Sequence, residues 1–527
     1  MPAPPGLIAE GTLREPDAVW SHVQKGSAGR LAGMPDSAAG AILSWAGADV
    51  TLGPLVVGSQ PFHVALGDAP DGLAFAVAMK LKDVAAARST LVDGDVALYR
   101  AEEADGMLRL APRTPDPAAH PALAIAGAGY LVVASTPADL ATLGAYAART
   151  LPGKPPPTSA LELRADPAAL GRAGKNAPDF AAKVTGILAA SARELLPREV
   201  DAAAFAACFT PGIRDMVAAA GDLAEARLDA DPGEGQVDTV AVFVPKPGDS
   251  GARRRLTAMH PAAASPLLDA PADATAALFW SDTAQLRAED ASTLGPCLGA
   301  ALGPILGTGG GPKLAELLAA WARGRGDWET ASFLAIPSVA GLVVRAPVAD
   351  AASASGSIRG FAELASQPSV ADAVRRLLPL RAGAVEPVEV PRVGKASVVM
   401  FPGQAQVFHG PGAAPTAAPD LAPPGLAWAV DAKEADLGLG LSPQELLAQS
   451  RPTASYRSHA SVERTVGALG ADASFVAILA PPGCCKGTAP AAAPLTFAWG
   501  RRAGNGRATL TLGDQLLGQI LARLTGP

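Results

Sequence analysis

A pattern that recurs along the chain constrains its fold more than any single motif does. Two consecutive prolines followed by a short apolar segment occur at Pro4-Pro5, Pro156-Pro157 and Pro423-Pro424, and a degraded copy lies at Pro271. The second copy follows the first by 152 residues, and Pro423 follows Pro271 by the same interval. This spacing predicts a tandem duplication in which two kinds of module alternate, in the order A-B-A-B.

Landmarks that lie 267 residues apart support the duplication. Asp83 follows the apolar segment FAVAMKLK and Asp350 follows LVVRAPVA, while Gly127 in GAGYLVVAS corresponds to Gly394 in GKASVVMFP. In the first pair an apolar strand leads into a helix, and in the second pair a turn leads into an apolar strand. The predicted modules are residues 1–152 (A), 153–250 (B), 271–410 (second A) and 426–527 (second B).

Two segments between these modules are predicted to be linkers. The first, residues 251–270, contains three consecutive arginines among small and polar residues, and it separates the two halves of the chain. The second, residues 411–425, contains several prolines, which favour an extended and fairly stiff spacer.

Local patterns indicate antiparallel strands joined by tight turns, together with amphipathic helices. LAFAVAMKL and SVVMF are apolar runs, and MLRLAPR and ATLTLGD alternate as half-buried strands do. The turns ADG at 104–106 and GNG at 504–506 suit hairpins. Capping sequences at 136–139 and 442–445 and the apolar stripe of DQLLGQILARLTG predict helices. The predicted fold class is therefore α+β, with duplicated antiparallel sheets that helices cover on one face.

Composition and charge exclude several classes of protein. Hydrophobic residues make up 49% of the 527-residue chain and charged residues 18%, which is typical of a globular protein rather than a disordered one. The formal net charge of −7 provides no field that attracts a phosphate backbone, so nucleic acid is not expected as a partner. No apolar run is long enough for a transmembrane span.

Three motifs resemble catalytic or ion-binding sequences but lack the rest of their signatures. Gly248-Asp249-Ser250-Gly251 matches the surroundings of a serine-protease nucleophile, with His120 upstream, yet three arginines follow it and a polar turn is the better interpretation. Residues 229–238 alternate carboxylates and glycines as calcium loops do, but a hairpin turn is expected there. GTGGGPK at 307–313 lacks the spacing of a phosphate loop. We therefore predict no catalytic residue, no metal site and no cofactor.

The four cysteines, Cys208, Cys297, Cys484 and Cys485, allow three disulfide pairings. A vicinal disulfide between the adjacent Cys484 and Cys485, pairing of these two with Cys208 and Cys297, and two reduced thiols in a loop all stay open. A structural disulfide formed in an oxidising compartment is the preferred interpretation, because four cysteines pair off evenly.

An alanine-rich, duplicated chain of hairpins and short helices without catalytic residues resembles uncharacterised exported proteins and lipoproteins of high-GC bacteria. The resemblance concerns the organisation of most of the chain and not a diagnostic motif. It implies a periplasmic or envelope-associated location if a leader precedes Met1, and a cytoplasmic location otherwise. It implies no particular activity.

Three kinds of function are compatible with these features. The leading hypothesis is a non-enzymatic exported scaffold or binding protein, built from two similar halves and recognising a protein partner. The alternative is a carrier that holds an apolar, lipid-like ligand between sheet and helices or between the halves, which suits a chain rich in small apolar residues. An enzyme of unidentified class comes third, because no nucleophile, base and orienting group can be named together. A carrier should contain a continuous apolar cavity, whereas a scaffold should not.

Overall fold

The structure is a computed structural model of the whole chain. It describes all residues except 70–71, 94–96, 114–120, 196–199, 308, 337–338, 366–383, 401–405, 408–415, 418–423, 481–493 and 526–527. The chain forms two compact units, each made of segments that are not consecutive in sequence. The first unit comprises Met1–Ala173, Gly221–Lys246 and Arg507–Pro527, and the second comprises Gly174–Ala220 and Pro247–Gly506.

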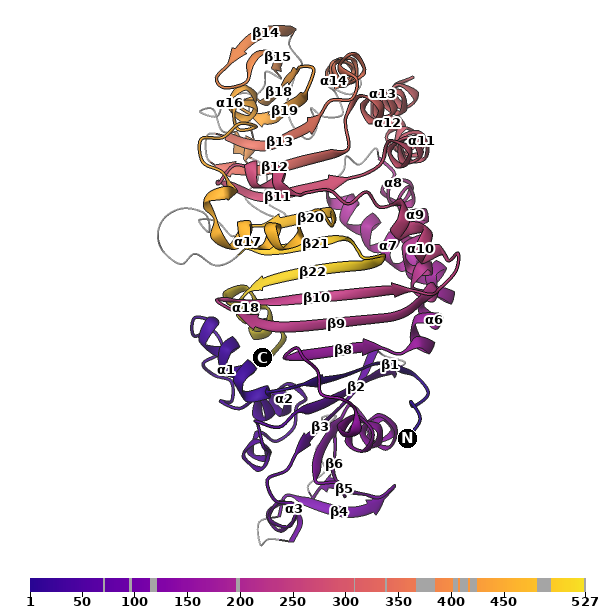
Figure 1. The fold of residues 1–527 in the computed structure, drawn as a ribbon, viewed down its shortest axis with the longest axis vertical. Helices are drawn as coiled ribbons and strands as arrows, with labels where there is room; N and C mark the ends of the chain where they lie inside the picture. Colours follow the sequence, from indigo (N-terminus) through magenta and orange to yellow (C-terminus); the bar gives the residue numbers. More distant parts are fainter. Residues whose placement is uncertain are drawn as a thin grey trace. The chain divides into compact units, whose positions relative to one another are not determined.

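The first unit is built around an antiparallel sheet. Its strands are neighbours in the order β4-β5-β6-β7-β3-β2-β1-β8-β9-β10-β22 (Figure 1). These strands span Leu7–Leu13 (β1), Phe62–Ala69 (β2), Gly72–Lys80 (β3), Tyr99–Ala104 (β4), Met107–Pro112 (β5), Ala122–Ala126 (β6), Tyr130–Ala134 (β7), Leu161–Ala165 (β8), Leu223–Gly233 (β9), Gln236–Pro245 (β10) and Asn505–Gly513 (β22). Asp105 and Gly106 form the turn between β4 and β5, both with positive φ, so the hairpin predicted at 104–106 is confirmed.

The second unit is built around antiparallel strands as well. Its strands are neighbours in the order β14-β15-β18-β19-β13-β12-β11-β20-β21. They span Ala274–Ser281 (β11), Trp328–Ile336 (β12), Val339–Pro347 (β13), Val385–Val390 (β14), Gly394–Met400 (β15), Pro424–Val430 (β18), Glu434–Leu441 (β19), Ala473–Leu479 (β20) and Leu495–Arg502 (β21). A separate short pair joins β16 (Gln406–Val407) and β17 (Thr416–Ala417).

The strand orders of the two units correspond one to one, from β4 and β14 at one end to β9 and β21. β1 begins at Leu7 and β11 at Ala274, and β3 begins at Gly72 and β13 at Val339, so both pairs lie 267 residues apart. In both units a helix follows the third strand: α3 (Val84–Arg88) after β3, and α14 (Ala351–Ala365) after β13. Nine strands of each unit therefore follow the same order.

The 152-residue interval does not describe the same relationship. Pro156-Pro157 precede β8, whereas Pro423 precedes β18, and these two strands hold different places in the two strand orders. The counterpart of β8 is β20, which lies between β11 and β21. The sheets therefore give no support to an alternating A-B-A-B arrangement, although they agree with an antiparallel α+β fold.

Helices cover both faces of the central strands of the first unit, where the sequence predicted cover on one face. Ala65 and Ala76 face a cluster with Leu143, whereas Val77 and Met79 face a second cluster on the other side of the sheet. Consecutive side chains of a strand point to opposite faces, so a strand that is apolar at every position buries both. The helices are α1 (Pro16–Gly26), α2 (Ala38–Trp45), α3, α4 (Pro137–Asp139), α5 (Ala145–Arg149), α6 (Pro167–Lys175) and α18 (Asp514–Thr525).

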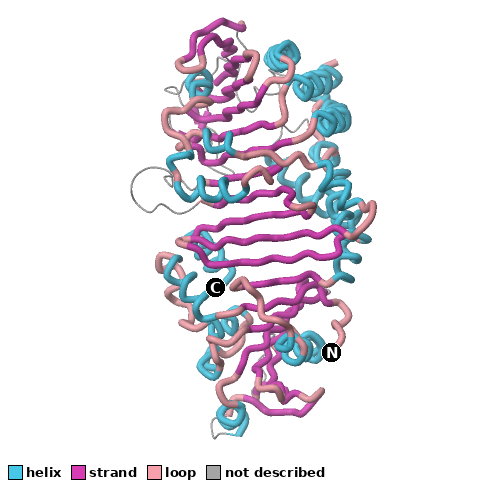
Figure 2. Tube along the Cα trace, in the orientation of Figure 1, coloured by secondary structure: helices cyan, strands magenta, loops and turns pink. Residues whose placement is uncertain are grey.

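The second unit carries longer helices (Figure 2). They are α7 (Ala177–Leu195), α8 (Ala202–Ala207), α9 (Thr210–Ala218), α10 (Gly251–Ala258), α11 (Ala284–Ala301), α12 (Gly303–Leu306), α13 (Gly310–Gly324), α14, α16 (Pro443–Ala448) and α17 (Ala460–Leu469). Phe279, Tyr456 and Ile478 are central to one core cluster, and Ile358 and Trp428 to another. Within the described ranges, no helix has the length and apolar character needed to cross a bilayer.

Two further sequence predictions need correction. Residues 251–270 are not a linker: they contain α10 and a short 3-10 helix, Ser265–Asp269, and bury Leu256 and Leu267. This segment forms helices because its apolar residues recur at helical spacing, although its overall composition is polar. Ser442 precedes α16 as predicted, but its φ of 53° is left-handed and its side chain does not cap the helix. Most of the predicted linker 411–425 lies outside the described residues.

Candidate functional site

The candidate functional site is an apolar pocket of about 370 Å³ in the first unit. Residues from α1, α2, β1, α18 and the segment between α1 and α2 line it. All of the lining residues are apolar: Leu13, Pro16, Val19, Trp20, Val23, Leu31, Met34, Ala38, Ala41, Ile42, Trp45 and Leu521.

Helix α1 supplies one wall because its apolar residues share one face. Pro16, Val19, Trp20 and Val23 recur at the i, i+3, i+4 and i+7 spacing of an amphipathic helix. Pro16 occupies the first turn, where its missing N–H costs nothing, and Asp17 adds a carboxylate at the positive end of the helix dipole.

Helix α2 supplies the opposite wall through the same spacing. Ala38, Ala41, Ile42 and Trp45 lie on one face. The side chain of Ser37 caps the helix by accepting a hydrogen bond from the Gly40 N–H at 3.1 Å. The small side chains of Ala38 and Ala41 leave the space between the two helices unfilled.

Hydrogen bonds fix the segment that connects the two helices. Trp20 Nε1 and Gln24 Nε2 both donate to the Pro35 carbonyl, at 2.8 and 3.1 Å. Asp17 Oδ1 accepts from the Ala38 N–H at 2.9 Å, which ties the start of α1 to the start of α2. The pocket walls are therefore held in place without a ligand.

Trp45 forms the rim of the pocket. Its side chain is 55% exposed, which is unusual for a tryptophan, and its ring centroid lies 5.2 Å from that of Phe75 on β3. The aromatic pair extends the apolar surface of the pocket outward. An exposed aromatic at the mouth of an apolar cavity is a typical contact for an apolar ligand.

Helix α18 closes one end of the pocket through Leu521. Its first turn is attached to α1, because Asp514 Oδ2 lies 3.2 Å from His22 Nε2 and Asp514 is almost fully buried. Burial raises the pKa of Asp514, and the neighbouring His22 opposes that rise. A Cβ at Gly26 would lie only 2.2 Å from the Asp514 Cβ, so the close approach of the two helices requires glycine there.

The chemistry of the pocket favours apolar ligands. The indole N–H of Trp20 on α1 is already engaged by the Pro35 carbonyl. Apart from the indole N–H of Trp45 at the rim, the remaining lining side chains carry no hydrogen-bonding group. A polar metabolite would lose its hydration without replacement, at a cost of about 1–3 kcal/mol per group by mutational scales. An acyl chain or another hydrocarbon surface makes no hydrogen bonds with water, so it loses none when it enters the pocket.

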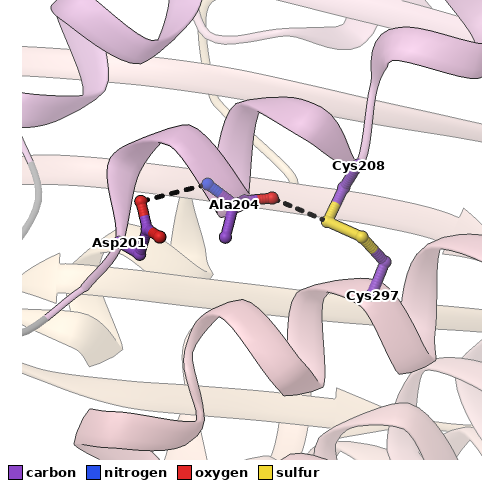
Figure 3. The surroundings of a disulfide bond; sticks show 4 residues. All are labelled: Asp201, Ala204, Cys208 and Cys297. Atoms are coloured by element: carbon purple, nitrogen blue, oxygen red, sulfur yellow. Dashed lines mark hydrogen bonds between the residues drawn. A yellow bond between two sulfur atoms is a disulfide. The ribbon is translucent and has the colours of Figure 1, made fainter.

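The structure places the predicted cysteines apart from this pocket. Cys208, at the end of α8, forms a disulfide with Cys297 of α11, both in the second unit (Figure 3). Asp201 caps α8 by accepting from the Ala203 and Ala204 N–H groups, and Cys208 Sγ lies 3.5 Å from the Ala204 carbonyl (Figure 3). A structural disulfide is thus present, and Cys484 and Cys485 lie outside the described residues.

The motifs that resembled catalytic or ion-binding sequences have structural roles. Ser250 of the GDSG sequence caps α10 by accepting from the Arg253 N–H at 3.1 Å, and His120 lies outside the described residues. Residues 229–238 form the β9–β10 hairpin, as predicted. GTGGGPK leads into α13 through Gly309, whose φ is 83°. No group of three metal-binding side chains occurs in the described part of the chain.

Sequence reasoning did not identify the pocket. The apolar stripes of α1 and α2 were its signal, since each holds four apolar residues at helical spacing and one of them, Trp45, stays exposed. Leu13 and Leu521 lie some 500 residues apart, and no sequence pattern joins them. Comparison with known protein families, with curated proteins and with solved structures finds no match to this chain.

Proposed function

We propose that the protein is a non-enzymatic binding protein whose first unit holds an apolar small molecule or a single acyl chain in the pocket between α1 and α2. The observation that carries the proposal is a cavity lined by apolar side chains alone, with an exposed tryptophan at its mouth. Its volume of about 370 Å³ lies within the range of ligand sites, roughly 300–1,000 Å³.

An exported, envelope-associated location is part of this proposal. The Cys208–Cys297 disulfide supports it, because structural disulfides persist in oxidising compartments and are rare in the cytosol. The weak resemblance to exported proteins of high-GC bacteria points the same way. Four free thiols in protein isolated from its native source, counted by intact-mass measurement, would remove this support.

A scaffold that recognises a protein partner is the second candidate. Helices α7 and α9 of the second unit expose Phe180, Ile187 and Met216 by 50%, 66% and 63%. Large apolar side chains exposed to this degree on neighbouring helices favour a contact surface. This surface belongs to a different unit, so the two candidates can be tested separately.

Filling or trimming the pocket is expected to weaken ligand binding without unfolding the protein. Ala41→Phe places a ring in the cavity, and Trp45→Ala removes the aromatic rim. Each substitution should weaken the binding of a spin-labelled stearic acid by about tenfold or more, which corresponds to about 1.4 kcal/mol. Quenching of tryptophan fluorescence by the spin label, titrated on the purified full chain, measures the affinity.

Ile187→Ala is the matched control, because Ile187 is an exposed apolar residue of the second unit. It should leave the affinity for stearic acid unchanged. Extraction of the purified protein followed by mass spectrometry should recover an apolar molecule from the wild type and less of it from Ala41→Phe. Equal affinity in the wild type and in Ala41→Phe would contradict the carrier function and leave the scaffold as the better candidate.

A further inference from the structure

A second, polar pocket of about 330 Å³ lies in the first unit, under a strap of three consecutive prolines. Residues 154–158, here called the proline strap, line this pocket together with residues of strands β1, β8 and β9. Side chains of both signs line the pocket: Glu10 on β1, Glu162 and Arg164 on β8, Arg227 on β9 and Lys154 of the strap.

Arg164 and Arg227 occupy directly opposed positions on β8 and β9. Side chains at opposed positions of an antiparallel pair lie on the same face, with Cβ atoms roughly 4.5–5.5 Å apart, and like charges there destabilise the sheet. Two guanidinium groups are therefore held close together on one face of the sheet, among the carboxylates of Glu162 and Asp229.

Each arginine forms an ion pair with one carboxylate through its Nε. Arg164 Nε pairs with Glu162 Oε1 at 2.8 Å, and Arg227 Nε pairs with Asp229 Oδ2 at 2.9 Å. The carboxylate of Glu10, which is opposite Arg164 on β1, accepts instead from the Tyr146 hydroxyl at 2.5 Å and from Lys154. Among the described residues, no hydrogen bond uses the terminal Nη groups of either arginine.

The strap that roofs the pocket is fixed in place. Ser159 Oγ lies 3.2 Å from Asp229 Oδ1, the Ala160 N–H donates to Asp231 Oδ1 at 2.7 Å, and Arg14 donates to the Thr158 carbonyl at 2.9 Å. Prolines restrict the backbone between these anchors and Lys154. The pocket is thus preformed and does not need to be ordered by a ligand.

We propose that Arg164 and Arg227 bind an oxyanion, a carboxylate or a phosphate, of a small polar ligand in this pocket. Guanidinium groups present their terminal N–H donors in a planar fork that matches such oxyanions. An oxyanion bridging the two arginines would offset their mutual repulsion. The site lies among different residues from those of the apolar pocket, so it does not depend on the function proposed above.

Binding of succinate and of inorganic phosphate to the purified full chain, measured by isothermal titration calorimetry at low salt, tests the proposal. We expect saturable binding of at least one of the two, weakened tenfold or more by Arg227→Gln and by Arg164→Gln. A preference for succinate identifies a carboxylate ligand, and a preference for phosphate identifies a phosphorylated one. Higher salt should weaken binding, because part of the attraction is between charges near the surface.

Thermal unfolding of the ligand-free protein checks that the arginine variants stay folded. Arg227→Gln removes both the contact with Arg164 and the ion pair with Asp229, so its melting temperature should stay close to that of the wild type. Arg88→Gln removes an exposed cation paired with Asp93 in the same unit and serves as the charge-matched control. The absence of binding of both anions at millimolar concentration, or undiminished binding in Arg227→Gln, would overturn the proposal.

Discussion

Replacing Cys208 and Cys297 together by alanine is expected to lower the free energy of unfolding of the second unit by about 2–4 kcal/mol. The disulfide closes a loop with a sequence separation of 89 residues, and a loop of that length restricts the unfolded chain strongly. It also attaches α8 to α11, so its removal leaves only non-covalent packing to hold α7, α8 and α9. Urea unfolding followed by circular dichroism measures the loss.

Hydrogen exchange of peptides from α8 and α9 gives a local readout of the same change. Their amides should exchange faster in the double variant than in the wild type, because these helices open more often when the covalent link is absent. A reducing agent should have the same effect on the wild type and none on these helices in the variant. Unchanged exchange in α8 and α9, together with an unchanged urea midpoint, would show that the disulfide contributes nothing to stability.

The second unit should lose stability as the pH rises from about 4.5 to about 7, because of Glu329. This residue is buried on β12, where its Oε2 lies 3.1 Å from Arg325 Nε and 3.4 Å from Trp321 Nε1. Burial outweighs both contacts and raises the pKa of Glu329 from 4.5 to about 7. The folded state therefore binds a proton that the unfolded state has released in this range, and the protonated form stabilises folding by about 3 kcal/mol.

Glu329→Gln should remove this pH dependence, because glutamine imitates the protonated side chain. Arg325 keeps a partner in the variant, since its Nη2 lies 2.5 Å from Asp282 Oδ2. Thermal unfolding at pH 4.5 should differ little between wild type and variant, while at pH 8 the variant should be the more stable. Glu316→Gln, which removes an exposed carboxylate paired with Lys313 on α13, is the control and should not alter the slope.

The difference between the two pH curves is the quantity to measure, because His63 of the first unit acts in the opposite direction. Burial lowers the pKa of His63 to about 4. In the unfolded chain this imidazole is protonated below about pH 6.5, whereas in the folded unit it stays neutral. Its contribution to the stability of the first unit is therefore lost as the pH drops from 6.5 toward 4. Parallel curves for wild type and Glu329→Gln would contradict the role assigned to Glu329.

The fold could be predicted further from sequence than the site could. The 267-residue spacing of Asp83 and Asp350 marks corresponding positions, because each aspartate lies between a strand and the helix that follows it. The repeated Pro-Pro motif did not identify corresponding strands, because prolines commonly precede strands and mark no particular position in a sheet. The sequence did not predict that helices cover both faces of the sheet, because runs of alanine and valine do not reveal on which side of a strand a helix packs.

The candidate sites were beyond sequence reasoning for a geometric reason. The apolar pocket joins α1 and α2 to Leu521, and the polar pocket joins Glu10 to Arg227; both depend on strand neighbours that are far apart in the chain. The opposition of Arg164 and Arg227 follows from the β8–β9 register, which no local pattern specifies. All four cysteines could be named in advance as disulfide candidates, but the sequence did not say that Cys208 pairs with Cys297.

The discontinuous build of the first unit sets the order in which a nascent chain can finish it. Residues 1–246 leave β10 with an open edge, which pairs with β22 only after the ribosome has made all of the second unit. Until then the edge is a template for wrong pairing, and the wall that Leu521 adds is missing. The apolar pocket, with Leu521 in its wall, is therefore complete only after the whole chain has been made.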